Sequence, residues 1–374
     1  MSEPRLSILH TCWEGHPSGQ TRVIIDLARA QTAAGHRVRV ACPAGSALEG
    51  QVIDAGVSAA PLTFGGAGET GAEIARIATE SRAELINAHS SRDRKAVLWA
   101  RRHRGVPAAV VFTRHVRTLT FPLKLWWQST QVERYIAVSR DVAERLIARG
   151  VPRGKLVVVP NGVPPGFMER VPDPAAVAEA RARLTRLPAA PIVGVVSRRK
   201  AQDVLVRALR HVERPLNLAL IGVGPEPLLE RLAAEAPQHA VTFVPFVTDP
   251  RPYYACLAVS ALPSRQEGLS IAQLESMALG IPFVGSRFAG IPDLTDDGVD
   301  GLLVEHGDTR AWARAIERLL SEPGLADRLV AAARRKVLES YTFDRTLART
   351  EAVYRDAIAF RARSRGGYQA VTAG

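Results

Sequence analysis

Short apolar runs alternate along the chain with longer segments in which apolar residues recur every three or four positions. The first run, Leu6 to His10, predicts a strand, because it is short and bounded by polar residues. A helix is predicted to begin near Thr21 and to end at Gly35, and Arg37 to Ala41 then alternates as a second strand. A strand, a glycine-containing loop, a helix and a strand in this order predict a parallel βαβ unit.

The same alternation continues through the rest of the chain and predicts two doubly wound parallel sheets. Prolines gather between residues 164 and 174, which is common between domains. We therefore predict a first domain over 1–170, a linker over 171–190 and a second domain over 191–343. The further predicted strands cover 85–88, 108–113, 135–138, 155–159, 191–196, 218–221, 241–244, 259–262 and 283–285.

The stretch 264–280 carries the strongest local signals in the chain. It follows the apolar run 256–263, which predicts a strand leaving a buried sheet. Ile271, Leu274 and Ala278 then share one helix face, and a glycine ends the helix. The free amides at the start of such a helix lie at the carboxyl edge of the sheet, where open α/β sheets bind ligands and where an anion is stabilised.

Two carboxylates belong to this stretch, Glu267 in the loop and Glu275 inside the helix. Carboxylates beside an anion site suit a sugar nucleotide, whose diphosphate takes the amides while its hydroxyls donate to the carboxylates. The alternative from spacing alone is that Glu267 complements the helix dipole and that Glu275 is solvated.

Residues 267–282, continued by 290–292, 301–304 and 307–308, resemble the donor-site signature of the family 4 glycosyltransferases. The resemblance implies retaining enzymes of the GT-B fold, an α/β architecture of two doubly wound Rossmann-like domains facing a cleft. It also implies that a C-terminal helix, here 344–362, crosses back to the first domain. The residues after 362 are polar and contain glycine, so we expect the helix to fray there.

In that family the first glutamate and the amides after it hold the transferred sugar, and the second glutamate holds the nucleotide ribose. The resemblance therefore implies a catalytic role for Glu267 and ribose binding by Glu275. The positions whose amides follow the first glutamate are Gly268, Leu269 and Ser270.

A basic turn follows the first strand of the second domain and contains Arg198, Arg199 and Lys200. Three cations at the carboxyl end of a strand make an anion site by charge alone, although a solvated turn has the same composition. The resemblance implies that Lys200 and one of the two arginines hold the diphosphate, with Ala201 in place of the family's glycine. Two further donor positions implied by the resemblance are Gly222 and Val247.

Polar residues also follow the predicted strands of the first domain, where an acceptor pocket is expected. His115 lies in a Thr-x-His segment that resembles the family's active-site histidine, which faces the donor sugar. A lone histidine in a loop is otherwise a surface or capping residue. The remaining acceptor-binding candidates are Gly19, His89, Arg92 and Arg114.

Residues 119–128 contain five bulky apolar side chains beside Arg114, Arg117 and Lys124. This pattern favours either an interfacial membrane patch or a helix packed in the core under the pocket. The net charge of +12 agrees with contact to anionic lipid, and equally with a genome that favours arginine. Because the arginines are scattered and no recognition module is legible, nucleic acid is not expected as a partner.

The 374 residues suffice for two domains of ordinary size, and no apolar run approaches the length of a membrane-spanning helix. The three cysteines are far apart, so neither a disulfide framework nor a zinc site is indicated. The N-terminus lacks the apolar core of a signal peptide, and we expect a cytoplasmic protein, with peripheral contact to the membrane as an option.

The resemblance implies a retaining glycosyltransferase, and together with these observations it predicts a UDP- or GDP-linked sugar as co-substrate, with no cofactor. No Asp-x-Asp pair follows a strand, so we expect no metal, and basic residues would stabilise the leaving diphosphate instead. The acceptor is expected to be a glycan or glycolipid, as in lipopolysaccharide or other envelope glycan synthesis. Two alternatives stay open, a sugar-nucleotide epimerase and a binding module without chemistry.

Overall fold

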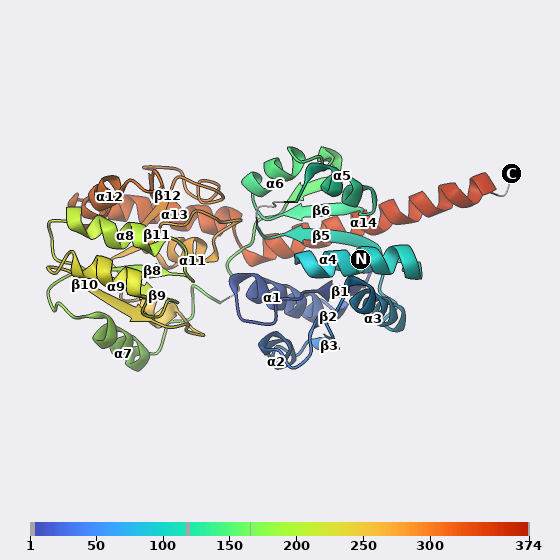
Figure 1. Ribbon diagram of the computed structural model, residues 1–374, viewed down its shortest axis with the longest axis horizontal. Coiled ribbons are helices and arrows are strands. Elements are labelled where there is room, and N and C mark those ends of the chain that lie inside the picture. Colours follow the sequence, from blue (N-terminus) through green and yellow to red (C-terminus); the bar gives the residue numbers. More distant parts are fainter. Residues whose placement is uncertain (1–3, 117–119, 165, 373–374) are drawn as a thin grey trace. The chain divides into compact units, whose positions relative to one another are not determined.

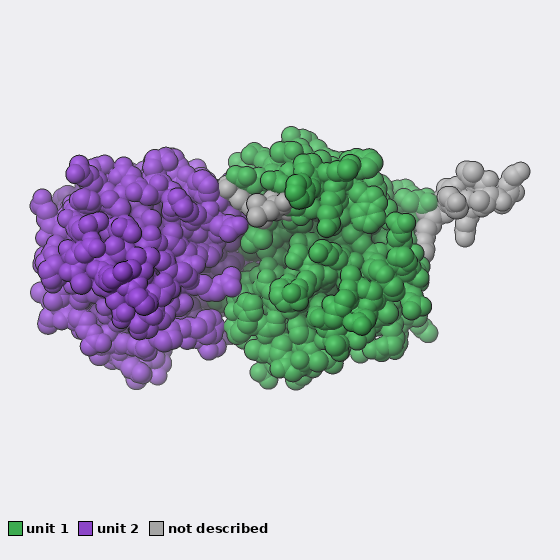
Figure 2. Space-filling model, in the orientation of Figure 1, with its two compact units in different colours: residues 1–161, 344–374 green, residues 162–343 purple. Residues whose placement is uncertain are grey.

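The computed structural model describes residues 4–116, 120–164 and 166–372. The chain divides into two compact units, one made of residues 1–161 and 344–374 and the other of residues 162–343 (Figure 2). Both contain a parallel sheet flanked by helices, so the α/β class and the GT-B arrangement of two Rossmann-like sheets are confirmed (Figure 1).

The first unit is built on a sheet for which the described residues provide seven strands, in the order β3-β2-β1-β4-β5-β6-β7. Every pair in it is parallel. Its strands are β1 (Ser7–Thr11), β2 (Arg37–Pro43), β3 (Ser58–Leu62), β4 (Leu85–Ala88), β5 (Ala109–Arg114), β6 (Arg134–Ala137) and β7 (Leu156–Val158). The helices are α1 (Gly19–Ala33), α2 (Ala47–Asp54), α3 (Ala67–Glu80), α4 (Ser91–Arg104), α5 (Pro122–Thr130), α6 (Arg140–Ile147) and α14 (Phe343–Thr372), with a 3₁₀ turn at Arg153–Lys155.

Helices on both faces explain why the central strands read as continuous apolar runs. Every residue of β1, β4 and β5 is buried. Helix α1 begins where the Ser18 hydroxyl accepts a hydrogen bond from the Thr21 amide, which satisfies one of the free amides of the first turn. The order of β1, β4 and β5 brings the carboxyl ends of these three strands side by side.

The C-terminal helix α14 packs on the first unit, as expected for a helix that crosses back. Val353, Tyr354 and Ala357 are buried in the same core cluster as residues of β1 and β5. The expected end at residue 362 is wrong, because α14 continues to Thr372. Among the described residues, no helix is both long and apolar enough to cross a membrane.

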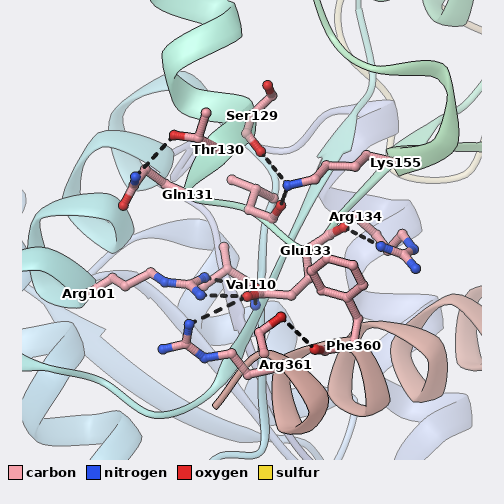
Figure 3. Close-up of polar contacts among 12 residues, drawn as sticks. Arg101, Val110, Ser129, Thr130, Gln131, Glu133, Arg134, Lys155, Phe360 and Arg361 are labelled. Atoms are coloured by element: carbon pink, nitrogen blue, oxygen red, sulfur yellow. Dashed lines mark hydrogen bonds and ion pairs between the residues drawn. The ribbon is translucent and has the colours of Figure 1, made fainter. Parts of the chain in front are cut away.

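A buried ion cluster fastens α14 and α4 to this sheet (Figure 3). The Arg101 guanidinium donates to both carboxylate oxygens of Glu133, at 2.8 and 2.5 Å, and the Val110 amide donates to the same group at 2.7 Å. Arg361 of α14 approaches Glu133 to 3.7 Å. The Glu133 carboxylate thereby links α4 and α14 to the start of β5.

The second unit is built on a parallel sheet with six strands among the described residues, in the order β10-β9-β8-β11-β12-β13. The strands are β8 (Ile192–Val196), β9 (Asn217–Ile221), β10 (Ala240–Val244), β11 (Val259–Leu262), β12 (Phe283–Ser286) and β13 (Leu302–Val304). The helices are α7 (Pro174–Leu184), α8 (Gln202–Ala208), α9 (Pro227–Ala234), α10 (Arg251–Tyr254), α11 (Ile271–Leu279), α12 (Thr309–Ser321) and α13 (Leu325–Ser340), with a 3₁₀ turn at Leu209–His211.

The predicted linker 171–190 needs a correction, because it contains helix α7, which belongs to the second unit. Asp173 caps this helix and Pro174 is its first residue. Proline is common at the first position of a helix, and this signal is missed when the prolines are interpreted only as marks of a linker. Ala180 and Leu184 are buried against the β8 and β9 side of the second core. Strands β3 and β13 were not predicted, since β3 contains a proline and β13 has only three residues.

Candidate functional site

The loop after β11 is held by polar contacts at both ends. Ser270 caps α11, its hydroxyl accepting from the Gln273 amide at 3.3 Å. At the other end of the loop, the Ser286 hydroxyl of β12 donates to the Ser264 carbonyl at 2.5 Å. Helix α11 ends at Gly280, whose φ of 74° lies in the left-handed region that glycine adopts without strain. The predicted strand, loop and helix are therefore all present.

Within this loop, Glu267 is buried and its carboxylate accepts a 2.5 Å hydrogen bond from Lys200 Nζ. Lys200 lies in the turn after β8, and β8 is the neighbour of β11 in the sheet. The pair therefore joins two loops at the carboxyl edge of the second sheet. The Glu267 side chain is almost completely buried, whereas the Lys200 side chain is partly exposed. Lys200 therefore neutralises the buried carboxylate while it remains in contact with solvent.

The other two cations of the basic turn have different surroundings. Arg199 is engaged by Glu226 at 2.9 Å and by Asp203 at 3.1 Å. Arg198 is exposed, and within the described ranges its side chain has no hydrogen-bond or ion-pair partner. Of the two arginines, Arg198 is therefore the one available to an anion. Ala201 takes a left-handed φ of 66° where a glycine would be unstrained.

Glu275 is buried inside α11, with only 4% of its surface exposed, so the interpretation as a solvated glutamate is wrong. Its carboxylate accepts a hydrogen bond from the Tyr254 hydroxyl at 3.1 Å, and the same hydroxyl lies 3.2 Å from the Ala272 carbonyl. Tyr254, at the end of α10, was not singled out from the sequence. Burying a carboxylate costs free energy on folding, which favours a role in binding.

The remaining predicted donor positions lie in the loops that follow β9, β10 and β11. Gly222 follows β9 with a φ of 98°, and a Cβ atom there would come within 2.7 Å of the Ser197 carbonyl oxygen. The backbone of the β9 loop thus lies directly against the basic turn. Gly268, Leu269 and Ser270 are buried after Glu267, and Val247 is half-buried.

In the first unit, three histidine rings at strand ends form one hydrogen-bonded row. His89 Nδ1 lies 3.0 Å from His115 Nε2, and His89 Nε2 lies 3.0 Å from His10 Nδ1. His10 Nε2 in turn lies 2.8 Å from Oε1 of Gln31 on α1. Both ring pairs stack with centroids 5.3 Å apart and planes 26° apart. The structure thus brings together His115 and His89, two of the predicted site residues.

Burial keeps this row neutral. It lowers the pKa of His10 to about 4, although the hydrogen bond that His10 donates to Gln31 raises it. It lowers the pKa of His115 to about 3, helped by the positive charges of Arg94 and Arg114, and it lowers the pKa of His89 well below 6.5. An uncharged imidazole offers one N–H donor and one bare nitrogen acceptor, and both are needed to continue such a row.

Within the described ranges, the other predicted residues of this unit make no hydrogen bond to the row. Arg114, the last residue of β5, is buried, and desolvation lowers its pKa to about 9. Arg92 is exposed and its guanidinium covers the Trp13 ring at 4.1 Å, away from the hydrogen bonds of the row. Gly19 is the exposed first residue of α1.

Sequence reasoning missed His10, Gln31 and Asp93. The Asp93 carboxylate accepts from the amides of His89 and Ser90 at 2.9 and 3.0 Å, so it orients the loop that carries His89. His10 closes a predicted strand just as His89 and His115 follow theirs. The position of all three histidines at the ends of predicted strands was a signal in the sequence. It indicates a single cluster only when the order of the strands in the sheet is known.

Two family descriptions match this chain. Residues 17–167 match "Glycosyltransferase Family 4" and residues 190–322 match "Glycosyl transferases group 1". Together the two matches cover most of both units.

Curated relatives match over part of their length. The chain is 33% identical over 221 residues to a GDP-mannose-dependent alpha-(1-6)-phosphatidylinositol monomannoside mannosyltransferase of Mycolicibacterium smegmatis, covering 54% of this chain and 57% of the relative. It is 32% identical over 213 residues to a D-inositol 3-phosphate glycosyltransferase of Xylanimonas cellulosilytica, covering 53% and 51%. The chain thus spans about half the length of the curated relatives it matches.

Solved structures match over nearly the whole chain. A glycosyltransferase from Rickettsia africae has a TM-score of 0.85 at 18% identity, covering 95% of this chain and 99% of the other. Anabaena Alr3699/HepE in complex with UDP-glucose has a TM-score of 0.80 at 19% identity, covering 96% and 99%. At these identities the likeness establishes the fold.

Proposed function

The chain belongs to the family 4 glycosyltransferases of the GT-B fold, and from that membership we propose that it transfers a sugar from a nucleotide-diphosphate sugar to a hydroxyl of a glycan or glycolipid. The observation that carries this proposal is the contact between Lys200 and Glu267. It unites a cation suited to the diphosphate with a carboxylate suited to sugar hydroxyls at one sheet edge.

On the donor side, Lys200, Arg198 and the first amides of α11 would hold the diphosphate and stabilise the negative charge that develops as it leaves. Glu267 would accept hydrogen bonds from the transferred sugar. Glu275 would accept from the ribose, with Tyr254 holding its second oxygen. Lys200, Arg198 and Glu267 lie in loops that follow β8 and β11 at the carboxyl edge of the second sheet, and Glu275 lies in the middle of α11.

We also propose that the anomeric configuration is retained and that no metal ion is required, with the acceptor hydroxyl attacking from the side of the leaving phosphate. His115 would help to orient the transferred sugar. Neutral His115 suits this task, because an uncharged ring can accept a hydrogen bond from a hydroxyl.

The identity of the sugar and the acceptor rests on the relatives. The name of the mannosyltransferase specifies GDP-mannose and a phosphatidylinositol mannoside, and Alr3699/HepE is bound to UDP-glucose. We propose a GDP- or UDP-linked hexose as donor and a lipid-linked or soluble glycan acceptor of the cell envelope, lipopolysaccharide included.

The first experiment is a thermal-shift panel of GDP-mannose, UDP-glucose, UDP-galactose, GDP and UDP. A true donor present at one hundred times its Kd should stabilise the native state by about 2.7 kcal/mol. Transfer to added glycans then separates the three functions that share this fold. An epimerase would convert the donor without an acceptor, and a binding module would show a shift but no turnover.

Variants of the basic turn test the site itself. Lys200→Met should lower kcat by roughly 10²–10³-fold, the usual effect of losing one preorganised electrostatic donor. Arg198→Met should also lose activity, whereas Arg199→Met should mainly lose stability, because Arg199 is held by carboxylates. Arg314→Met, at an exposed position of α12, removes the same charge as a control. Full activity of Lys200→Met, with strict dependence on added magnesium or manganese, would reject the proposed chemistry.

A second proposal concerns association with a membrane surface. Helix α5 buries Leu125, but the helix and its N-cap residue Phe121 leave four bulky apolar side chains exposed, with Phe121 exposed to 80% and Leu123 to 77%. Trp126 and Trp127 are exposed on the same helix. Arg117 and Leu119, which belonged to the predicted patch, lie outside the described residues. Exposed aromatic residues beside a lysine, in a chain of net charge +12, support peripheral binding to anionic lipid.

Vesicle flotation tests this second proposal. The wild type should float with phosphatidylglycerol vesicles and remain in solution with neutral phosphatidylcholine vesicles. Replacing Trp126 and Trp127 by serine should abolish flotation without lowering the melting temperature. Unchanged flotation of the double variant would refute the patch, and a large loss of soluble protein would show that the helix face is packed inside the protein instead.

A further inference from the structure

The histidine row of the first unit has a direction, which follows from the hydrogen-bonding rules of imidazole. A neutral ring carries one proton, so each ring can donate through one nitrogen and must accept through the other. The Gln31 carbonyl oxygen faces His10 Nε2 at 2.8 Å and can only accept. His10 therefore carries its proton on Nε2, and its Nδ1 is an acceptor.

The same assignment passes from ring to ring. His89 Nε2 must donate to His10 Nδ1, which leaves His89 Nδ1 as an acceptor for His115 Nε2. The two contacts have the same length, the same ring spacing and the same angle between planes, so the arrangement is repeated. All three rings are thereby Nε2–H tautomers, and the bare nitrogen at the end of the row is Nδ1 of His115.

We propose that Gln31, His10 and His89 are positioning residues that hold His115 in one tautomer, with Nδ1 presented as a hydrogen-bond acceptor to a hydroxyl of the substrate. The assignment of that hydroxyl to a sugar rests on the proposed function, whereas the tautomer does not. Burial supports it, since His10, His89 and Gln31 are sealed from water and exchange no protons directly with solvent.

The row also explains why Gln31 is buried on the inner face of α1. A glutamine at a wholly buried helix position costs free energy unless its polar atoms are used. Its oxygen is used by His10, whereas its amide nitrogen has no hydrogen-bond partner among the described residues.

The first test is spectroscopic and uses the wild-type protein. Long-range proton–nitrogen correlation spectra of histidine-labelled protein at pH 7.5 distinguish protonated from bare ring nitrogens. Single histidine variants assign the signals among the nine histidines. We expect a protonated Nε2 and a bare Nδ1 for His10, His89 and His115 alike. Protonated Nδ1 nitrogens throughout, or rapid averaging between tautomers at His115, would overturn the proposal.

Two substitutions then interrupt the row without touching His115. Gln31→Met removes the anchoring oxygen at nearly constant size, and His10→Phe keeps a ring but removes both nitrogens. Each should mix the tautomers of His115 and lower kcat by about 10- to 100-fold, the range seen when a partner that orients an active imidazole is lost. The donor KM should stay within about twofold, because the proposed contacts to the diphosphate and the ribose belong to the second unit.

Non-additivity separates positioning from a general structural role. Because both changes cut the same row, the double variant should be no slower than either single variant, whereas independent damage would multiply. Thr32→Ala, at the neighbouring exposed position of α1, is the matched control and should leave kcat unchanged. Multiplicative losses would refute the row. If the spectra show the expected tautomers but no transfer is found with any donor, the proposed function fails and the row stands.

Discussion

Glu133→Gln is the substitution whose effect on stability the structure determines most closely. The Glu133 carboxylate accepts three hydrogen bonds, two from Arg101 and one from the Val110 amide, and Arg361 adds a second positive charge (Figure 3). A glutamine keeps the size of the side chain but replaces one accepting oxygen by an NH₂ group. That group would face an Arg101 N–H, so a donor would meet a donor.

The magnitude follows from burial. The side chains of Arg101 and Glu133 are only 10% and 5% exposed, so the variant leaves a buried guanidinium without its counter-charge. Removing one partner of a buried pair typically costs about 3–5 kcal/mol. For a unit of this size 1 kcal/mol corresponds to roughly 2–4 °C. We therefore expect the first unit to melt about 6–20 °C lower, with the second unit unchanged.

Differential scanning calorimetry can check this, because the two units are expected to give separate transitions. Glu80→Gln is the matched control. Arg76 also donates to both oxygens of Glu80, at 2.7 and 2.9 Å, but the side chains are 60% and 50% exposed. Such an exposed pair is worth at most about 0.5 kcal/mol. Equal shifts for the two variants would refute the argument that burial determines the loss.

Three further predictions concern backbone strain and pH. Ala201→Gly should stabilise the second unit by up to about 1 kcal/mol in urea denaturation, because φ is 66° at this position; a lower midpoint would contradict this. Gly222→Ala should destabilise the second unit by at least about 1–3 kcal/mol, since a Cβ would clash with the Ser197 carbonyl; unchanged stability would refute the clash. The unfolding free energy should fall between pH 6.5 and 5. The folded-state pKa values of His10 and His115 lie below the unfolded value, so the unfolded state binds more protons there, at about 1.4 kcal/mol per ring and pH unit. A urea midpoint that does not change between pH 6.5 and 5 would refute this expected loss of stability.

Local sequence signals were sufficient for most strands and for the ends of the donor loop. The run before Ser264, the serine at the helix start and the glycine at its end are short-range signals that act within one turn. They were enough to predict β11 and α11, and the resemblance of residues 267–308 was enough to indicate the family. The structure confirms β11 and α11, and α11 begins one residue after its capping serine.

Which side chains meet was decided only by the tertiary structure. Lys200 reaches Glu267 because β8 and β11 are neighbours in the sheet, although the two residues are 67 positions apart. His10, His89 and His115 form one row because β1, β4 and β5 are consecutive in the other sheet. No local pattern encodes the order of strands, since the backbone hydrogen bonds of a parallel sheet are the same whichever strand lies alongside.

The burial of Glu275 shows the same division. Its helix was predictable, but helical spacing alone does not tell whether a polar position faces solvent or another element. Tyr254, which follows β10 in the chain, comes to lie against α11 and covers the carboxylate. Secondary structure arises from interactions between near neighbours in the chain, and such neighbours can be identified directly in the sequence. The site arises from contacts between distant segments, which exist only once both sheets have assembled their strands in order.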